Sequence, residues 1–191
     1  MQALILAAGM GKRLGALTKE ATKCMVEVCG TKLIDSAIAS IVEAGIRDLV
    51  VVIGYKGAGL RSYLEGRYPD LRIRFVENEI YDKTNNIYSL WLAREALLSD
   101  DTILIESDLI FERDLIRELV QAPEPNMAVV ARFQSWMDGT VTLLDDEGFV
   151  RSVIDKKDFK WKNIDDYYKT VNIYKLSKEF SAKYYLPFME A

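Results

Sequence analysis

The sequence predicts an α/β protein built on a doubly wound, mainly parallel sheet. Near-continuous apolar runs at 3–8, 48–54 and 102–107 are typical of strands that are covered on both faces. Amphipathic segments of helical period separate these runs, and this alternation favours parallel strands joined by helical crossovers. After residue 133 the pattern changes toward hairpin-like segments, which predicts a small β subregion attached to the sheet.

Each element of the core follows from its periodicity and from the residues that end it. Gly45 ends the helix that follows the first strand, and alternating residues define the strand at 72–78. In chain order we expect strands at 3–8, 48–54, 72–78, 102–107 and 127–133, with helices at 33–45, 59–68, 86–98 and 113–121.

The last third is expected to hold a hairpin, a strand and a helix. The hairpin spans 140–155 with its turn at Asp145-Asp146-Glu147-Gly148, a strand covers 167–177, and Pro187 interrupts a helix over 178–191. We interpret 1–191 as a single domain with a core at 1–133 and a second part at 134–191. The final helix lacks a stop signal, which predicts that the domain is incomplete at its C-terminus or fused to a further segment.

Composition excludes several classes of function. With 25 Lys and Arg against 29 Asp and Glu, the net charge of −4 argues against a nucleic-acid binder. The absence of a long apolar run or a signal peptide predicts a cytoplasmic protein that does not insert into membranes, with two reduced cysteines. There is no histidine, so any catalysis must use carboxylates, cations and backbone dipoles.

The loop after the first strand, "AAGMGKRLG", resembles two known phosphate-binding designs only superficially. Gly11-Lys12 is followed by Arg13 rather than by the Ser or Thr of a P-loop. A dinucleotide fingerprint needs glycine where Leu14 stands, and the second strand lacks the acidic residue that binds ribose. A plain turn would explain Gly9 but not the cations that follow, which suit a ligand with several phosphates.

The stretch "LILAAGMGKRLGALTKEATKCMVEVCGTKLID" resembles the signature of nucleotidyltransferases that couple an NTP to a sugar phosphate or a phospho-alcohol. The similarity covers some thirty residues; Ala16 and Thr22 stand where that signature has proline. The resemblance implies a Rossmann-like fold of the nucleotide-diphospho-sugar transferase type. It also implies that Gly11 and Arg13 cradle the β and γ phosphates and that Lys23 reaches the α-phosphate, whereas Lys19 is interpreted as a solvated loop lysine. The segment Leu6, Ala7, Ala8 and Gly9 is expected to line the base and ribose.

"TILIESDLIFE" places acidic residues directly after the third buried strand. Ligands of open α/β sheets bind at the carboxyl ends of the strands, so Asp108 is expected on the same edge as the glycine-rich loop. Asp108 is either a cap of the following turn or, as the resemblance implies, the ligand of Mg²⁺. Ser107 is assigned to the nucleotide, Glu106 stays undecided between core and acceptor, and the family's second acidic ligand is expected beyond residue 191.

The element "NNIYSL" indicates which base is bound. It resembles the cytidylyltransferases that act on phosphocholine and 2-aminoethylphosphonate. Either Asn85 or Asn86 is expected to cap the helix at 86–98, leaving the other for the nucleotide, because an amide both donates and accepts as cytosine requires.

The acceptor is expected to lie against residues of the last third. The resemblance assigns the acceptor phosphate to Lys156, although charged runs are also common in solvated turns. Trp136 and Asp138 either receive an ammonium group or, for the tryptophan, form a packing plug. Asn172 occupies a strand where sugar-specific members carry glycine.

These features predict a Mg²⁺-dependent enzyme that transfers CMP from CTP to phosphocholine or 2-aminoethylphosphonate and releases pyrophosphate. The acceptor is already largely dianionic and attacks in line, so Arg13, Lys23 and Asp108 act by positioning and charge stabilisation rather than as a base. A sugar-1-phosphate nucleotidylyltransferase and a non-catalytic nucleotide-binding module of a fused protein are the alternatives.

Overall fold

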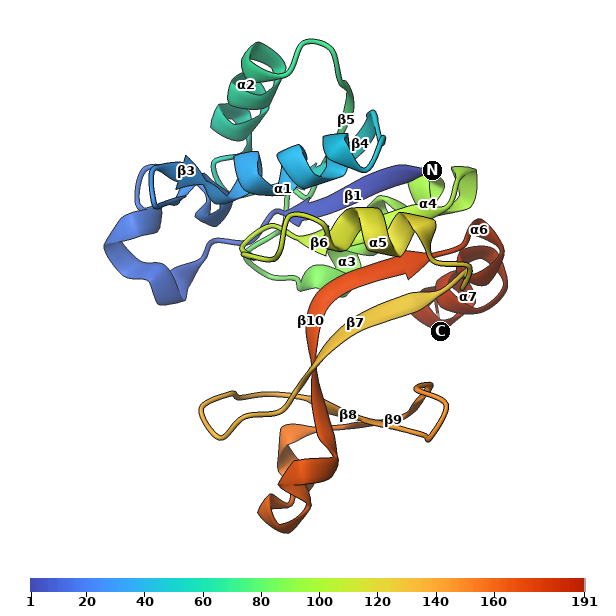
Figure 1. Cartoon of the computed structure of the whole chain (residues 1–191). Helices are drawn as coiled ribbons and strands as arrows, with labels where there is room; N and C mark the ends of the chain where they lie inside the picture. The colour runs from blue at the N-terminus through green and yellow to red at the C-terminus, as the bar shows by residue number, and fades with distance from the viewer. Residues whose placement is uncertain (191) are drawn as a thin grey trace. The chain divides into compact units, whose positions relative to one another are not determined.

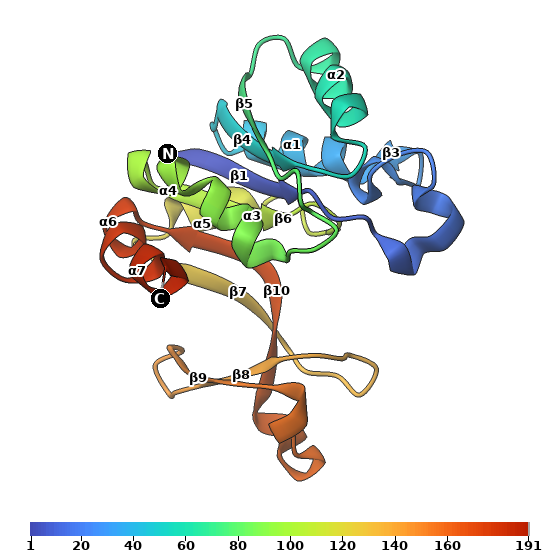
Figure 2. The same cartoon turned by 180° about the vertical axis from the view of Figure 1, so that it is seen from behind.

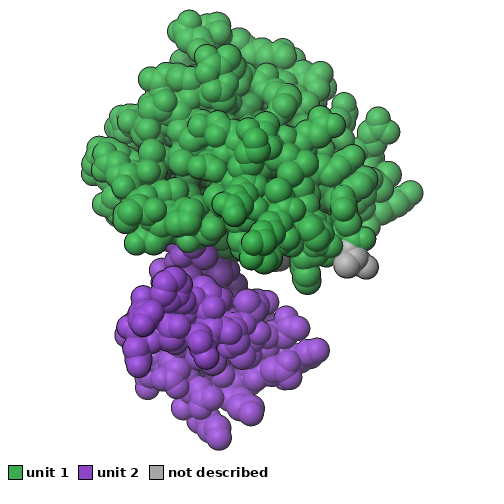
Figure 3. All heavy atoms as spheres, turned by 90° about the vertical axis from the view of Figure 1, so that its right-hand side faces the viewer, with its two compact units in different colours: residues 1–127, 174–191 green, residues 128–173 purple. Residues whose placement is uncertain are grey.

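The computed structural model of the protein describes residues 1–190, apart from the side chains of Lys12 and Arg13. It divides into two compact units, coloured separately in Figure 3. Unit 1 comprises residues 1–127 together with those from 174 onward, and unit 2 comprises residues 128–173. The chain therefore leaves unit 1, builds unit 2 and returns to unit 1.

The sheet of unit 1 is built on four parallel strands, as the apolar runs predict. They are β1 (Gln2–Ala7), β4 (Asp48–Ile53), β5 (Arg72–Glu77) and β6 (Thr102–Glu106), in the spatial order β5-β4-β1-β6. The strand β10 (Tyr167–Leu176) continues the sheet next to β6. Parallel pairing brings the carboxyl ends of β1, β4 and β6 to one edge of the sheet.

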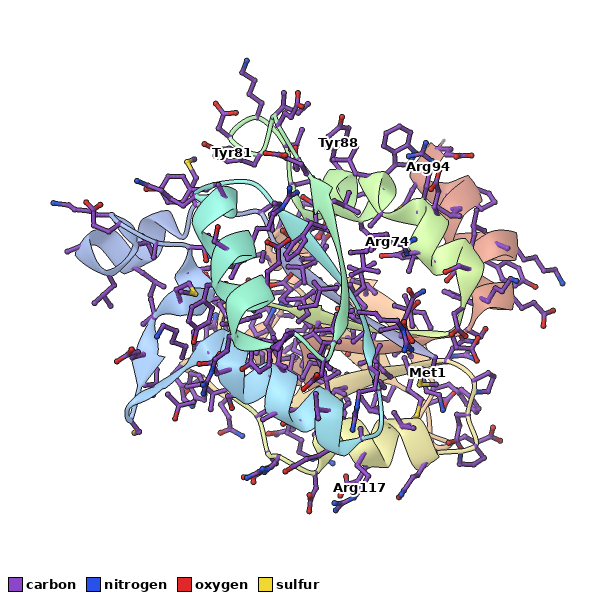
Figure 4. All side chains as sticks on the ribbon, turned by 90° about the horizontal axis from the view of Figure 1, so that it is seen from above. Met1, Arg74, Tyr81, Tyr88, Arg94 and Arg117 are labelled. Atoms are coloured by element: carbon purple, nitrogen blue, oxygen red, sulfur yellow. The ribbon has the colours of Figure 1, made fainter. Side chains whose placement is uncertain are left out.

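Helices cover both faces of this sheet (Figures 1 and 2). On one face lie α1 (Leu33–Glu43) and α5 (Leu115–Gln121), and on the other α3 (Asn86–Leu92) and α4 (Arg94–Ser99); α2 (Gly57–Arg67) contacts β4 and β5. Tyr88 and Arg94 extend from the α3 and α4 side, and Arg117 of α5 from the opposite side (Figure 4). Leu4 and Leu6 of β1 pack in one buried cluster with Leu90 and Leu97, which fixes the α3 face of the sheet.

Two predicted helices differ from expectation. The segment 86–98 is broken at Ala93. There the Trp91 carbonyl accepts hydrogen bonds from the Ala93 N–H and from the Arg94 guanidinium. The same guanidinium lies over the Trp91 ring, with its Cζ 4.1 Å from the ring centroid. At the other end, α6 (Lys178–Phe180), a π-helical turn (Ser181–Tyr185) and α7 (Leu186–Glu190) follow one another. The irregularity lies in the turn directly before Pro187, whose missing N–H and ring prevent regular i→i−4 pairing with that turn.

Short elements around the glycine-rich loop were not predicted. They are 3-10 turns at Lys12–Thr18 and Lys23–Met25 and a small hairpin of β2 (Glu27–Val28) and β3 (Thr31–Lys32). Cys29 and Gly30 form the turn of this hairpin, and both have positive φ (52° and 79°).

Unit 2 contains the predicted hairpin, β8 (Val141–Leu144) and β9 (Val150–Ile154). The Asp145 carboxylate accepts from the N–H groups of Glu147 and Phe149, so the turn forms where expected. β8 pairs antiparallel with β10, and β7 (Met127–Arg132) also pairs with β10. Phe133, Val141 and Tyr167 form the small core of this unit, closed by 3-10 turns at Lys156–Asp158 and Trp161–Asp166.

In the part of the chain that the structure describes, no helix combines the length and the apolar character that crossing a bilayer would require. The assignment of separate roles to 1–133 and 134–191, and a cytoplasmic location, stay predictions.

Candidate active site

The glycine-rich loop begins where β1 ends, at the carboxyl edge of the sheet. The Ala8 carbonyl accepts from the Tyr55 N–H at 3.0 Å, and Gly54 packs so closely that a Cβ there would lie 2.8 Å from the same oxygen. The chain therefore stays tightly held up to Ala8. Gly9 begins an open stretch, because a Cβ at Gly9 would meet no atom within 4 Å.

Gly11 sits against the residue expected to bind the α-phosphate. Its φ of 62° lies in the left-handed region, and a Cβ there would be 2.9 Å from Cβ of Lys23 and 3.1 Å from Cγ2 of Thr18. The Thr18 hydroxyl donates to the Gly11 carbonyl at 3.3 Å. The absence of a side chain at residue 11 thus lets the loop close over Lys23.

Lys23 and Asp108 meet at the carboxyl edge, although they come from distant parts of the sequence. The Lys23 Nζ is 2.9 Å from a carboxylate oxygen of Asp108, and their side chains are 17% and 35% exposed. The structure therefore confirms that Asp108 and the glycine-rich segment lie at the same edge of the sheet. Asp108 is not the N-cap of any of the described helices. A partly exposed cation and a carboxylate side by side can each exchange their partner for a charged ligand.

Ser107 precedes Asp108 and is almost fully buried. Its N–H donates to the Leu6 carbonyl at 3.3 Å, so the backbone continues the pairing of β1 and β6. Its Oγ is buried and has no hydrogen-bond partner among the described residues. A buried hydroxyl without a partner is energetically costly, and a contact of Ser107 with the nucleotide stays a prediction.

The two asparagines at the start of α3 make different contacts. The Asn85 Oδ1 accepts from the N–H groups of Ile87 and Tyr88, so Asn85 is the cap of α3. The Asn86 side chain, which was expected to be left for the nucleotide, donates from its Nδ2 to the Glu106 Oε1 at 2.6 Å, and its contact with a nucleotide stays a prediction. This contact also places Glu106, which the sequence left undecided, on the α3 side of the sheet.

Asn78 organises the loop that leads to these asparagines, and sequence reasoning missed it. Its buried amide donates to the hydroxyls of Thr84 and Ser89, and its carbonyl oxygen accepts from the Ile80 N–H. The signal available in the sequence was an asparagine at the end of the predicted strand 72–78. Fixing both ends of this loop positions the start of α3.

Cys24 follows Lys23 and is a structural residue. Its side chain is fully buried, with the Thr22 hydroxyl 3.0 Å from its Sγ. Burial raises the pKa of the Cys24 thiol to about 11, in spite of this hydrogen bond and the nearby Lys23. Cys24 therefore stays a thiol near neutral pH and anchors the segment that carries Lys23.

Unit 2 brings together two of the residues assigned to the acceptor. The Lys156 Nζ is 2.9 and 3.0 Å from the two carboxylate oxygens of Asp138. The hydrogen bond from Lys156, supported by the Gly139 N–H, holds the pKa of Asp138 below its ordinary value. Trp136, in the same loop, is 80% exposed, so the packing-plug interpretation is wrong for unit 2 as it stands.

Asn172 has a left-handed backbone within β10. Its φ is 59°, and the Thr170 hydroxyl lies 3.3 Å from its Oδ1. Asparagine and glycine adopt this conformation more readily than other residues. A contact between Asn172 and an acceptor stays a prediction.

Each unit thus holds its own polar pairs. Unit 1 carries the Lys23–Asp108 and Asn86–Glu106 pairs, and unit 2 carries the Asp138–Lys156 pair. The side chain of Arg13, assigned to catalysis and to the phosphates, lies outside the described residues. Among those described, no group of three or more Asp, Glu and Cys side chains is arranged to hold a metal ion.

Comparison with known proteins defines the class. The family model of the MobA-like NTP transferase domain matches residues 3–152, so the chain belongs to this family of nucleotidyltransferases.

Individual relatives agree with this assignment. The chain is 31% identical to CMP-5'-(3-aminopropyl)phosphonate synthase of Streptomyces rubellomurinus, over all of this chain but only 30% of that protein. It is 33% identical to CTP:phosphoglutamine cytidylyltransferase of Campylobacter jejuni, over 94% of this chain and 74% of that protein. The chain thus spans less than a third of one of these curated relatives and about three quarters of the other.

A solved structure matches the whole fold. CTP:phosphocholine cytidylyltransferase from Streptococcus pneumoniae superposes with a TM-score of 0.77 and 25% identity, over 99% of this chain and 75% of that one. The predicted α/β fold and the predicted resemblance to cytidylyltransferases of phosphonates and phosphocholine are both confirmed.

Proposed function

We propose that the protein transfers CMP from CTP to a zwitterionic acceptor, phosphocholine or 2-aminoethylphosphonate, with release of pyrophosphate and with Mg²⁺ as cofactor. The observation that carries the proposal is the pairing of Lys23 with Asp108 at the carboxyl edge of the sheet. Relatives named for cytidylyl transfer or for CMP-phosphonate synthesis support the choice of nucleotide.

Binding of the nucleotide and metal would separate Lys23 from Asp108 and give each of them a new partner. Lys23 turns to the α-phosphate, where negative charge increases during transfer, and Asp108 turns to the metal. Asp108 fits Mg²⁺ because its side chain, with hard carboxylate oxygens, is 35% exposed, which leaves room for phosphate oxygens and water. When bound, Mg²⁺ would supply charge neutralisation on the triphosphate.

The Asp138–Lys156 pair matches a zwitterion in the same way. A ligand that carries an ammonium group and a phosphate offers a cation to Asp138 and an anion to Lys156, so it replaces both charges of the existing pair. The exposed Trp136 ring in the same loop provides a cation–π face for the ammonium. A sugar phosphate would satisfy Lys156 but leave Asp138 without a cation.

The chemistry then requires no general base. An acceptor oxygen, already ionised near neutral pH, attacks the α-phosphorus; one P–O bond forms and the bond to the β-phosphate oxygen breaks. Pyrophosphate leaves with the electron pair, and the product is the CMP-activated acceptor. This accounts for a site assembled from a sequence without histidine.

The test is pyrophosphate release with Mg²⁺, using each NTP against phosphocholine, 2-aminoethylphosphonate and glucose-1-phosphate, with mass spectrometry of the product. We expect turnover with CTP and a zwitterionic acceptor only. Turnover with glucose-1-phosphate would establish the sugar-phosphate alternative. Saturable CTP binding without turnover for any acceptor would instead favour a binding module.

Lys23→Ala is the decisive variant and Lys19→Ala its control. Lys19 lies in the same loop, its side chain is exposed, and its backbone carbonyl accepts from the Tyr55 hydroxyl at 3.3 Å. Lys23→Ala should lower kcat by at least about 100-fold, the usual size of such electrostatic contributions, while Lys19→Ala stays near wild type. Equal losses in the two variants would show that general positive charge, not Lys23, matters.

A further inference from the structure

We infer that Glu106 is a positioning residue that fixes the orientation of the Asn86 carboxamide and thereby selects cytosine over uracil. The inference rests on the proposed function and adds to it the means of base selection.

The position of Glu106 follows from the strand register. Glu106 is the last residue of β6 and pairs with Leu6 of β1 at the carboxyl edge. Side chains alternate along a strand, so Glu106 points to the same face as Leu104, which packs with Leu90 of α3. The carboxylate therefore lies next to the start of α3, with its Oε1 2.6 Å from the Asn86 Nδ2.

The hydrogen bond between Asn86 and Glu106 can run in only one direction. An ionised carboxylate accepts hydrogen bonds and donates none, so it must meet the NH₂ end of the amide. One N–H and the Oδ1 of Asn86 then remain for a ligand, and the Oδ1 is the only acceptor of the two. Rotating the amide would bring this oxygen against the carboxylate, which costs a charge-assisted hydrogen bond and adds repulsion.

An oriented carbonyl oxygen discriminates between the two pyrimidines. Cytosine carries an amino group at C4, which donates to such an oxygen, whereas uracil carries a carbonyl oxygen there, which is repelled by it. Asn85 cannot take this role, because its own Oδ1 is engaged by the N–H groups of Ile87 and Tyr88. The selection therefore depends on Asn86 and on the carboxylate that orients it.

The experiment compares CTP with UTP in four proteins: wild type, Glu106→Ala, the charge-conserving swap Asn86→Asp/Glu106→Gln, and the control Glu112→Ala. Glu112 is an exposed acidic residue in the segment after β6. Dissociation constants from calorimetry, kcat and KM for both nucleotides, the Mg²⁺ requirement and the Tm are measured for each.

We expect Glu106→Ala to reduce the CTP/UTP preference in Kd and KM by about tenfold or more, corresponding to one hydrogen bond to a charged group. The swap should restore the preference, since the introduced glutamine amide donates to one oxygen of the introduced aspartate and leaves the other oxygen as an acceptor. A structural role alone would lower the Tm without changing this ratio.

Several results would overturn the inference. One is an unchanged CTP/UTP ratio in folded Glu106→Ala, and another is a swap variant that fails to regain selectivity while still binding nucleotide. A Mg²⁺ requirement that rises in Glu106→Ala at constant selectivity would make Glu106 a metal ligand instead. If wild type bound no CTP, the proposed function would fail as well; if wild type preferred CTP and only the variants disagreed, the proposed function would stand.

Discussion

Replacing Gly11 with alanine should damage both stability and nucleotide binding. The φ of 62° costs an L-residue about 1–2 kcal/mol, since this region crowds Cβ against the backbone. The new Cβ would also lie 2.9 Å from Cβ of Lys23, where carbon atoms normally stay about 3.5–4.0 Å apart. Relief of this overlap adds about 1–3 kcal/mol, as overpacking does elsewhere. The total is about 2–5 kcal/mol, which lowers the Tm by on the order of 10 °C for a chain of this size.

The assay is thermal unfolding followed by circular dichroism, with calorimetric titration of CTP on the same samples. Gly9→Ala is the control for stability, because no atom lies within 4 Å of a Cβ there, and its Tm should stay close to that of wild type. Gly11→Asn should fall between the two, since asparagine tolerates positive φ but keeps the overlap. Equal Tm values for Gly11→Ala and Gly9→Ala would refute this account of the loop.

Three further predictions concern titration and capping. In native protein at pH 8, Ellman's reagent should label the exposed Cys29 rapidly. The buried Cys24, whose pKa is raised to about 11, should react only after denaturant is added. Rapid labelling of both thiols in native protein would contradict the packing. Because the pKa of Asp138 is lowered in the folded protein, its ion pair should stabilise the fold at pH values above the ordinary carboxyl pKa of about 3.9. This stabilisation should be lost as the pH falls through the lower pKa of the folded state. In Lys156→Gln, NMR titration should show the pKa of Asp138 rising toward its ordinary value. Asn85→Ala should cost about 1 kcal/mol by removing the cap of α3, measured as a lower Tm, and Asn85→Asp should retain most of it.

Much of the fold could be predicted because strands buried on both faces carry apolar residues without interruption. β1, β4 and β6 each lie within one residue of the expected bounds. The break at Ala93 could not be predicted, since it depends on the Arg94 guanidinium reaching back to the Trp91 carbonyl. The β2–β3 hairpin was missed because its turn places a cysteine, not the usual asparagine or aspartate, in the left-handed region.

The location of the candidate site at the carboxyl edge of the sheet could be predicted, but the individual side-chain contacts could not. The sequence placed Asp108, directly after a buried strand, on the same edge as the glycine-rich loop, and the structure pairs Asp108 with Lys23 of that segment. No pattern in the sequence relates Asn86 to Glu106, because each belongs to a different element and the contact exists only after the sheet and α3 assemble. The role of each of these residues toward a ligand is still a prediction.

The interrupted course of the chain has a consequence for how the protein can be recombined. Unit 2 is inserted between residues 127 and 174 of unit 1, and its two connections run through strands that pair with each other. A segment bounded in this way can be exchanged as one piece without re-threading the rest of the chain. Chimeras that replace residues 128–173 and keep the glycine-rich loop, Lys23 and Asp108 would therefore test whether the acceptor is selected by unit 2.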